Sequence, residues 1–177
     1  MKFLSLALLC LIGGSALAAD PVEFTVGSFV FERPGEWKWV VPSSSMRKAQ
    51  LAVPGANNES AEVNFFHFGP GQGGGIQANV ERWFGQFQGA STSQKDAQVG
   101  NTRIVYVEAA GTFFSGMPGG PTTPMEGYAL RGAILEDPVH GDVFVKMTGP
   151  AALVEQAWEG FDAMVRSAAS TLGTTPR

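Results

Sequence analysis

Cysteine is almost absent from this chain, and its single copy lies where processing would remove it. Cys10 falls in an N-terminal stretch, residues 1–18, with the features of a secretory signal peptide: Lys2 gives a positive start, residues 3–12 are largely apolar, and Ala16–Ala18 forms a small-x-small cleavage site. Cleavage would leave a mature protein without disulfides or a reactive thiol. We therefore expect an exported protein, in the periplasm of a bacterium or secreted.

Positive charge is also scarce, and it is never clustered. The chain has 12 Lys and Arg against 16 Asp and Glu, a net charge of −4 that becomes −5 when Lys2 is lost with the leader. A chain without a basic block is a poor partner for nucleic acid or for an anionic membrane. No second apolar stretch approaches the roughly 20 residues that a transmembrane helix needs. We expect no nucleic-acid binding and no membrane insertion after signal cleavage.

No internal repeat and no linker divides the rest of the chain. Its length suits one domain with its own core. We expect this domain over residues 20–170, followed by a flexible tail over residues 171–177.

Strand patterns alternate with two amphipathic helical patterns along this domain. Period-two alternation and turn residues predict strands over 22–31, 37–41, 46–53, 62–68, 102–107, 111–114, 128–135 and 142–147. Apolar residues at helical spacing predict one helix over residues 76–87 and another that opens at Gly149–Pro150. The order predicts an α+β fold, a largely antiparallel sheet covered by two main amphipathic helices.

Two segments of the sequence resemble the PsbP-like fold. They are "FVFERPGEWKWV" (residues 29–40) and "VFVKMTGPAALVEQAWEGFDAMVRSA" (residues 143–168). That fold is shared by the extrinsic PsbP protein of photosystem II, a nuclear Ran-binding factor and many exported bacterial proteins. The middle of the chain, "GGGIQANVERWFGQF" with "GGPTTPMEGYALRGAI", is similar to uncharacterised exported bacterial proteins. The resemblance implies a PsbP-like α/β/α sandwich and an exported protein, but no reaction.

A glycine-rich stretch precedes the first predicted helix. Gly69, Gly71 and Gly74 spell G-x-G-x-x-G, the spacing of a dinucleotide-binding turn. Pro70 removes a backbone donor from this turn, and the strands before it look antiparallel, so we interpret the glycines as a hinge between strand and helix. Gly73 and Gly74 remain candidates for holding an anion with exposed amides at the helix N-terminus.

The first predicted helix carries a polar flank beside its apolar face. Asn79, Arg82 and Gln86 share this flank and could contact a ligand or a partner, since Arg near aromatic residues is a common interface anchor. The alternative is a half-exposed border without function. The Gly- and Pro-rich segment 115–127 is expected to be a long loop, which either contributes to binding or is disordered.

Catalytic and metal-binding patterns are weak. His67 and His140 are the only histidines, and neither has the neighbouring ligands of a metal site, so no metal and no cofactor is predicted. His67 lies in a predicted strand and could act as a base only beside a partner that the sequence does not name. The Lys146–Gly149 segment echoes the K-T-G motif of penicillin-binding enzymes with an extra residue, in a chain too short for such an enzyme.

These observations favour an exported, non-enzymatic binding or accessory protein with a protein partner in the cell envelope. Its expected contact surface comprises the glycine loop with Gly73 and Gly74, the Asn79, Arg82 and Gln86 flank, the loop around Pro118–Pro124, and His67. The alternative hypothesis is a small periplasmic enzyme or small-ligand-binding protein with a pocket near His67 and Arg82. A pocket where either residue meets a buried carboxylate would favour that alternative.

Overall fold

The computed structural model describes residues 22–42, 44–116 and 120–172. The expected leader, residues 1–18, lies outside them, as do residues 173–177 of the expected tail. Thr171, placed in that tail by the sequence, is the last residue of the final helix.

The centre of the fold is a seven-stranded sheet in which every neighbouring pair is antiparallel. Its strands, in spatial order, are β3 (Lys38–Trp39), β4 (Arg47–Pro54), β5 (Ser60–His67), β9 (Val143–Pro150), β8 (Thr122–Leu135), β7 (Thr102–Gly116) and β6 (Phe87–Val99). A separate hairpin pairs β1 (Val22–Val26) with β2 (Phe29–Arg33). A short 3₁₀ turn, η1 (Ala56–Asn58), joins β4 to β5.

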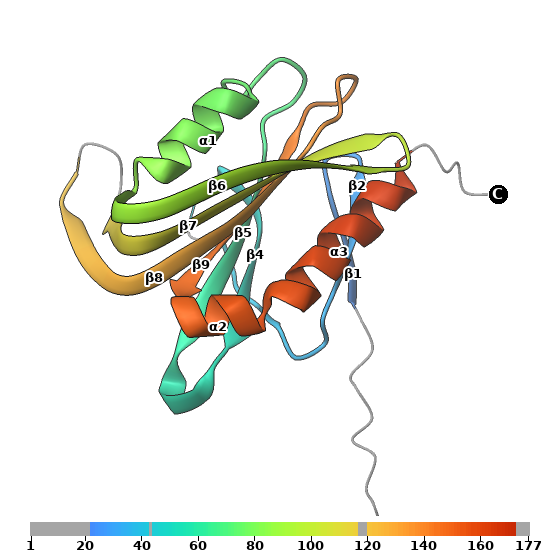
Figure 1. The fold of residues 1–177 in the computed structure, drawn as a ribbon. Helices are drawn as coiled ribbons and strands as arrows, with labels where there is room; N and C mark the ends of the chain where they lie inside the picture. The colour runs from blue at the N-terminus through green and yellow to red at the C-terminus, as the bar shows by residue number, and fades with distance from the viewer. Residues whose placement is uncertain (1–21, 43, 117–119, 173–177) are drawn as a thin grey trace, which may run out of the picture.

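Helices cover both faces of the sheet (Figure 1). Helix α1 (Ile76–Phe84) lies on one face, and α2 (Ala151–Gln156) and α3 (Trp158–Thr171) lie on the other. This arrangement confirms the expected α+β class and the α/β/α sandwich. Within the described part of the chain, no helix has the length and apolar character needed to cross a membrane.

The face toward α2 and α3 is apolar and well covered. Phe65 in β5, Met147 in β9 and Phe161 in α3 are fully buried. The β1–β2 hairpin extends this cover over the β4–β5 side, where the rings of Phe31 and Phe65 meet with centroids 5.2 Å apart. Burying each such side chain contributes roughly 1.5–3 kcal/mol, so this face supplies most of the core.

The face toward α1 has a smaller apolar cluster. Val80 and Trp83 of α1 pack on residues of β7, β8 and β9, among them Leu130 and Phe144. Trp83 lies directly on Gly132, where a Cβ atom would overlap its ring. The predicted burial of the α1 aromatic face is therefore correct for Trp83, whereas Phe84 is only half-buried.

Three elements differ from the expectation, each where a turn or a helix end falls inside the expected range. Residues 22–31 are not one strand but a hairpin, since Gly27 adopts a φ of 59° and reverses the chain. The first helix ends at Phe84 rather than at residue 87, and Phe87 begins β6. The final helix is divided at Ala157 into α2 and α3.

Two further segments form strands that the sequence did not predict. Residues 87–99 form the 13-residue edge strand β6, which the sequence conceals because its side chains are small, polar and exposed on both faces. The segment 115–127 is largely strand rather than loop: β7 runs to Gly116, β8 begins at Thr122, and these two residues pair. Residues 117–119 lie outside the described part.

Candidate functional site

The glycine loop, residues Gly69–Gly75, has backbone torsions that require glycine. All five of its glycines have positive φ, between 65° and 89°, a region that L residues rarely adopt. Asn79 holds this loop, because its buried amide donates to the carbonyls of Gly73 and Gly75, both at 2.7 Å. The loop follows an antiparallel strand, so it lacks the parallel context of a dinucleotide fingerprint.

The turn between β8 and β9 lies against the glycine loop. Gly141 approaches the backbone of Gly69 so closely that a Cβ atom there would overlap it. The buried Asp137 carboxylate organises the turn by accepting hydrogen bonds from Ser28 Oγ and from the backbone of His140. Burial alone would raise the Asp137 pKa, but these hydrogen bonds lower it to about 2. His67 Nε2 lies 3.0 Å from the carbonyl oxygen of His140.

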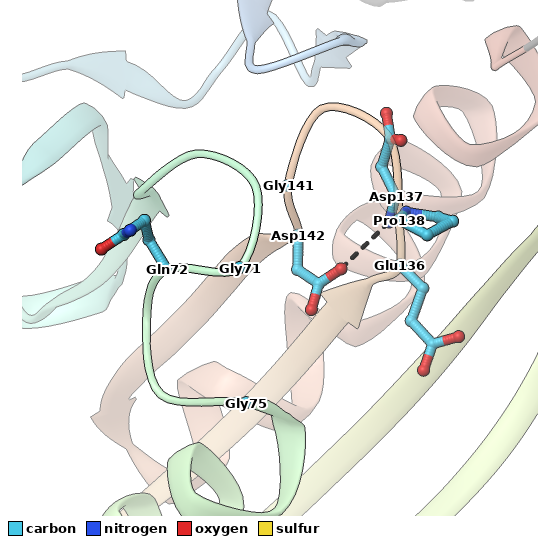
Figure 2. Close-up of a pocket in the computed structure, with 8 residues that line it drawn as sticks. All are labelled: Gly71, Gln72, Gly75, Glu136, Asp137, Pro138, Gly141 and Asp142. Carbon is cyan, nitrogen blue, oxygen red and sulfur yellow. Dashed lines mark hydrogen bonds between the residues drawn. The ribbon is translucent and has the colours of Figure 1, made fainter.

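A pocket of about 430 Å³ is lined by residues of both the glycine loop and this turn (Figure 2). The Asp142 carboxylate lies between the two and accepts a hydrogen bond from the Asp137 backbone at 3.1 Å, whereas the Asp137 carboxylate points away from the pocket. Neither His67 nor Arg82 lines it. Across residues 22–42, 44–116 and 120–172, no three His, Cys, Asp or Glu side chains are grouped to hold a metal.

The predicted flank of α1 divides into three different environments. Asn79 is buried and holds the glycine loop, while Arg82 is exposed, with its guanidinium near Gly74. Gln86 lies just past the helix and accepts a hydrogen bond from Lys146 in β9. The six predicted residues, His67, Gly73, Gly74, Asn79, Arg82 and Gln86, therefore do not converge on one pocket. Gln86 instead leads to a polar cluster that the sequence analysis did not identify.

This cluster, here called the polar row, consists of Gln50, Asn64 and Lys146. They lie side by side on β4, β5 and β9, because Gln50 pairs with Asn64 and Asn64 pairs with Lys146. Lys146 pairs in turn with Gly132, the residue beneath Trp83, which places the row on the α1 face. All three residues are buried, with exposed fractions of 5%, 7% and 9%. A buried polar row in the middle of a sheet is unusual.

Lys146 has the most perturbed environment of the polar row. Its ammonium donates to Gln86 Oε1 and lies 5.2 Å from the ring centroid of Phe113. Burial is the main cause that lowers the Lys146 pKa; the charge of Arg47 acts in the same direction, that of Glu62 opposes both, and the result is a pKa of about 8. At pH 7 the Lys146 side chain is therefore a buried ammonium that is still charged, although its pKa of about 8 lies only a little above the pH.

Two oxygen atoms beside Lys146 lack hydrogen-bond partners. Three buried side-chain polar atoms are unpaired within the described residues, and two of them are Asn64 Oδ1 and Thr148 Oγ1. Asn64 uses its other amide atom to donate to Glu62 Oε2 at 3.2 Å. A buried polar atom left unpaired costs about 1–3 kcal/mol. The polar row thus lowers stability where an apolar row would raise it.

Charged and aromatic groups border the row on opposite sides. Arg47 donates to Gln50 Oε1 at 2.9 Å and lies 3.9 Å from Glu62, at the more exposed side. On the other side stands an aromatic wall of Phe87, Phe113 and Tyr128. Its neighbouring ring centroids are 5.1 and 6.2 Å apart. The arrangement can bind a group that is polar at one end and apolar at the other.

The sequence itself contains a signal for this site. Lys146 interrupts the apolar run Val143–Met147, and Asn64 interrupts the shorter run Val63–Phe66. A run that is apolar on both strand faces indicates a central strand, so a polar residue within it must be buried. The K-T-G comparison drew attention to Lys146 for the wrong reason.

Comparisons with known proteins identify the fold and nothing finer. No protein-family model matches the chain, and no curated protein sequence matches it. Among solved structures, cyanobacterial PsbP (CyanoP) from Synechocystis sp. PCC 6803 is similar, with a TM-score of 0.55 and 11% identity over 90% of this chain and 96% of that one. A protein of unknown function from Pseudomonas aeruginosa, PA94, gives a TM-score of 0.47 and 13% identity over 90% and 99%. The chain therefore has the PsbP-like fold that its end segments suggested.

Proposed function

We propose that this chain is an exported, non-enzymatic binding or accessory protein that contacts a protein partner of the cell envelope through the α1 face of its sheet. One observation carries the proposal: the polar row is buried in the centre of the sheet with two oxygens unpaired beside a desolvated ammonium. Such an arrangement weakens the folded state, and functional sites are where proteins retain weakening of this kind.

The alternative of an enzyme with a pocket near His67 and Arg82 has less support. The geometry that would favour it is a buried carboxylate in contact with either residue. His67 lies instead against a backbone carbonyl, and Arg82 is exposed on α1. The buried carboxylate nearby, Asp137, is held by Ser28 and by the turn it organises. Its low pKa suits a fixed anion rather than a general base near pH 7.

Capture of proteins from envelope extracts tests the proposal when a buried-lysine variant is compared with a surface-lysine control. Wild type, Lys146→Met and Lys95→Met would be immobilised in equal amounts; Lys95 is a surface lysine of β6, with a side chain 62% exposed. We expect a partner protein that wild type and Lys95→Met retain and that Lys146→Met loses. Fractionation of cells expressing the full chain tests export independently. Retention of the same proteins by all three baits, or an intact leader on cytoplasmic protein, would contradict the proposal.

A further inference from the structure

We propose that the polar row is a subsite for a carboxylate that carries an N–H donor one carbon away, as in the C-terminal residue of a polypeptide or in a free N-acyl amino acid. This inference rests on the proposed binding function and names the chemistry that its site recognises. The carboxylate is assigned to Lys146 of the row and to Thr148, two residues further along β9, and the N–H group is assigned to Asn64 Oδ1.

The charges of the site favour an anion. Lys146 and Arg47 contribute two positive charges near the row, and Glu62 contributes one negative charge. Glu62 is directed to Arg47 and Asn64, at 3.9 and 3.2 Å, and its side chain is 55% exposed, so it neutralises Lys146 incompletely. The neutral Gln86 is the acceptor that the ammonium has among the described residues. An ammonium has three donors, so a carboxylate can join Gln86 without displacing it.

The unpaired oxygens distinguish one class of anion from another. Asn64 Oδ1 is an acceptor, so an anion that carries no proton to donate, such as sulfate, would place oxygen against oxygen at Lys146 and leave Asn64 unpaired. An acyl-amino acid carries an N–H group next to its carboxylate and can satisfy both. Thr148 Oγ1 can donate to the second carboxylate oxygen, because a hydroxyl is both donor and acceptor. The three side chains are neighbours on the β5–β9 pair. Asn64 lies opposite Lys146, and Thr148 lies opposite Glu62, the position two residues before Asn64.

The aromatic wall supplies a place for an apolar side chain. Phe113 lies against Lys146, and its ring stacks on Tyr128 at an interplanar angle of 9°. A terminal residue with an aliphatic side chain would lay that side chain on these rings while its carboxylate reaches the ammonium. Gln86 and Thr148 are only partly buried, so we assign the entry of the ligand to their side of the row.

Three small probes test the assignment by NMR titration of the ¹⁵N-labelled protein. N-acetyl-L-leucine carries both groups, N-acetyl-L-leucinamide lacks the carboxylate, and 4-methylpentanoate lacks the N–H group. We expect N-acetyl-L-leucine to shift the signals of β5, β9 and Phe113 and to bind at least tenfold more tightly than the amide. 4-Methylpentanoate should bind several-fold more weakly than N-acetyl-L-leucine. Equal binding of the acid and the amide, or signal changes confined to residues away from these strands, would overturn the inference.

Variants assign each contact. Lys146→Met should weaken N-acetyl-L-leucine at least tenfold, and Thr148→Val, which keeps the side-chain shape, should weaken it about threefold or more. Asn64→Ala should reduce the advantage of N-acetyl-L-leucine over 4-methylpentanoate to less than twofold, because only Asn64 senses the N–H group. Lys95→Met is the matched control and should leave all three affinities unchanged. An undiminished advantage in Asn64→Ala would contradict the assignment.

Two further comparisons complete the test. The first distinguishes a polypeptide terminus from a free acyl amino acid as the source of the carboxylate, and the second distinguishes failure of this inference from failure of the proposed function. A hexapeptide ending in leucine should bind more tightly than N-acetyl-L-leucine if a polypeptide terminus is recognised, and no more tightly if the ligand is a free acyl amino acid. If Lys146→Met abolishes partner capture but none of the acids binds, this inference fails and the proposed function stands. If the acids bind but capture does not depend on Lys146, the partner proposal fails and the subsite stands.

Discussion

The two faces of the sheet differ in how completely their polar groups are satisfied. On the face toward α2 and α3, Arg131 forms ion pairs with both Glu108 and Glu155, and its guanidinium stacks on Trp158 with a separation of 4.9 Å. On the face toward α1, Asn64 and Thr148 keep unpaired oxygens beside Lys146. The third unpaired buried atom among the described residues, Arg33 Nε, belongs to the β1–β2 hairpin and not to the sheet. Within the sheet, one face thus has its charges paired and the other has polar groups left open.

The difference follows from what covers each face. Two helices and the β1–β2 hairpin lie over the first face, and their apolar side chains complete one continuous core. A single nine-residue helix lies over the second, and the apolar cluster beneath it draws on β7, β8 and β9. The polar row begins where this cluster ends. Most of the apolar core lies on the α2–α3 face. Because that face supplies most of the stability, the α1 face can retain unpaired polar groups and carry a binding site.

The largest expected effect lies on the well-covered face. Phe161→Ala removes a fully buried ring from α3 and should lower the free energy of unfolding by about 3–5 kcal/mol. Urea unfolding followed by circular dichroism measures it, with exposed Glu159→Ala on the same helix as the control. A loss below 1 kcal/mol would mean that this face does not carry the core.

An overpacking substitution on the α1 face should have a smaller effect. Gly132→Ala places a methyl group against the ring of Trp83 and should destabilise by about 1–3 kcal/mol as α1 is displaced. The same urea titration measures the loss, and a change in tryptophan fluorescence would report the displaced ring. Gly127→Ala, where no atom lies within 4 Å of the added group, tests the alternative that any strand glycine responds equally. Because Gly127 has a φ of 67°, its expected effect comes from backbone strain alone and leaves Trp83 fluorescence unchanged.

The smallest expected effect is at the glycine loop. Asn79→Ala removes the hydrogen bonds to Gly73 and Gly75 and should cost about 1–2 kcal/mol. Amide hydrogen exchange should show faster exchange in residues 69–78 than in wild type, whereas exposed Arg82→Ala should change stability by less than 0.5 kcal/mol. Unchanged exchange in Asn79→Ala would show that the loop is held by other contacts.

Side-chain periodicity predicts the parts of this fold that are amphipathic. The α1 pattern identified a helix with Trp83 inward, and the alternation of residues 128–135 and 142–147 located the paired strands β8 and β9. Strand β6 has no apolar face, because it is the exposed edge of the sheet, so its sequence resembles a loop. The β1–β2 turn does leave a signal in the sequence, because the inward positions change from even numbers (Phe24, Val26) to odd numbers (Phe29, Phe31) across it.

The candidate site was harder to predict than the fold because it depends on pairing between distant strands. Gln86 belonged to the predicted contact surface and does lie at the site, but Asn79 proved to support the glycine loop. Lys146 and Asn64 are 82 positions apart in the sequence, and only the β5–β9 register brings them together. Periodicity shows that each is buried within its strand, and the register between the two strands is set by the whole sheet.

The central claim is that the polar row lowers the free energy of unfolding because its groups are kept for binding a ligand, and Lys146→Met tests this claim most directly. Unfolding free energies of this variant and of wild type should be measured from pH 7 to pH 10.5. Below pH 8 Lys146 is protonated in both the folded and the unfolded wild type, so the folded state carries the full desolvation penalty. Between pH 8 and the ordinary lysine pKa of 10.5, the folded state has lost the proton and the unfolded state still binds it, so the free energy of unfolding of wild type rises with pH. We predict that Lys146→Met is about 1–3 kcal/mol more stable than wild type at pH 7 and that this gap narrows by pH 10.5. A variant less stable than wild type at pH 7, or a gap that does not change with pH, would contradict the claim.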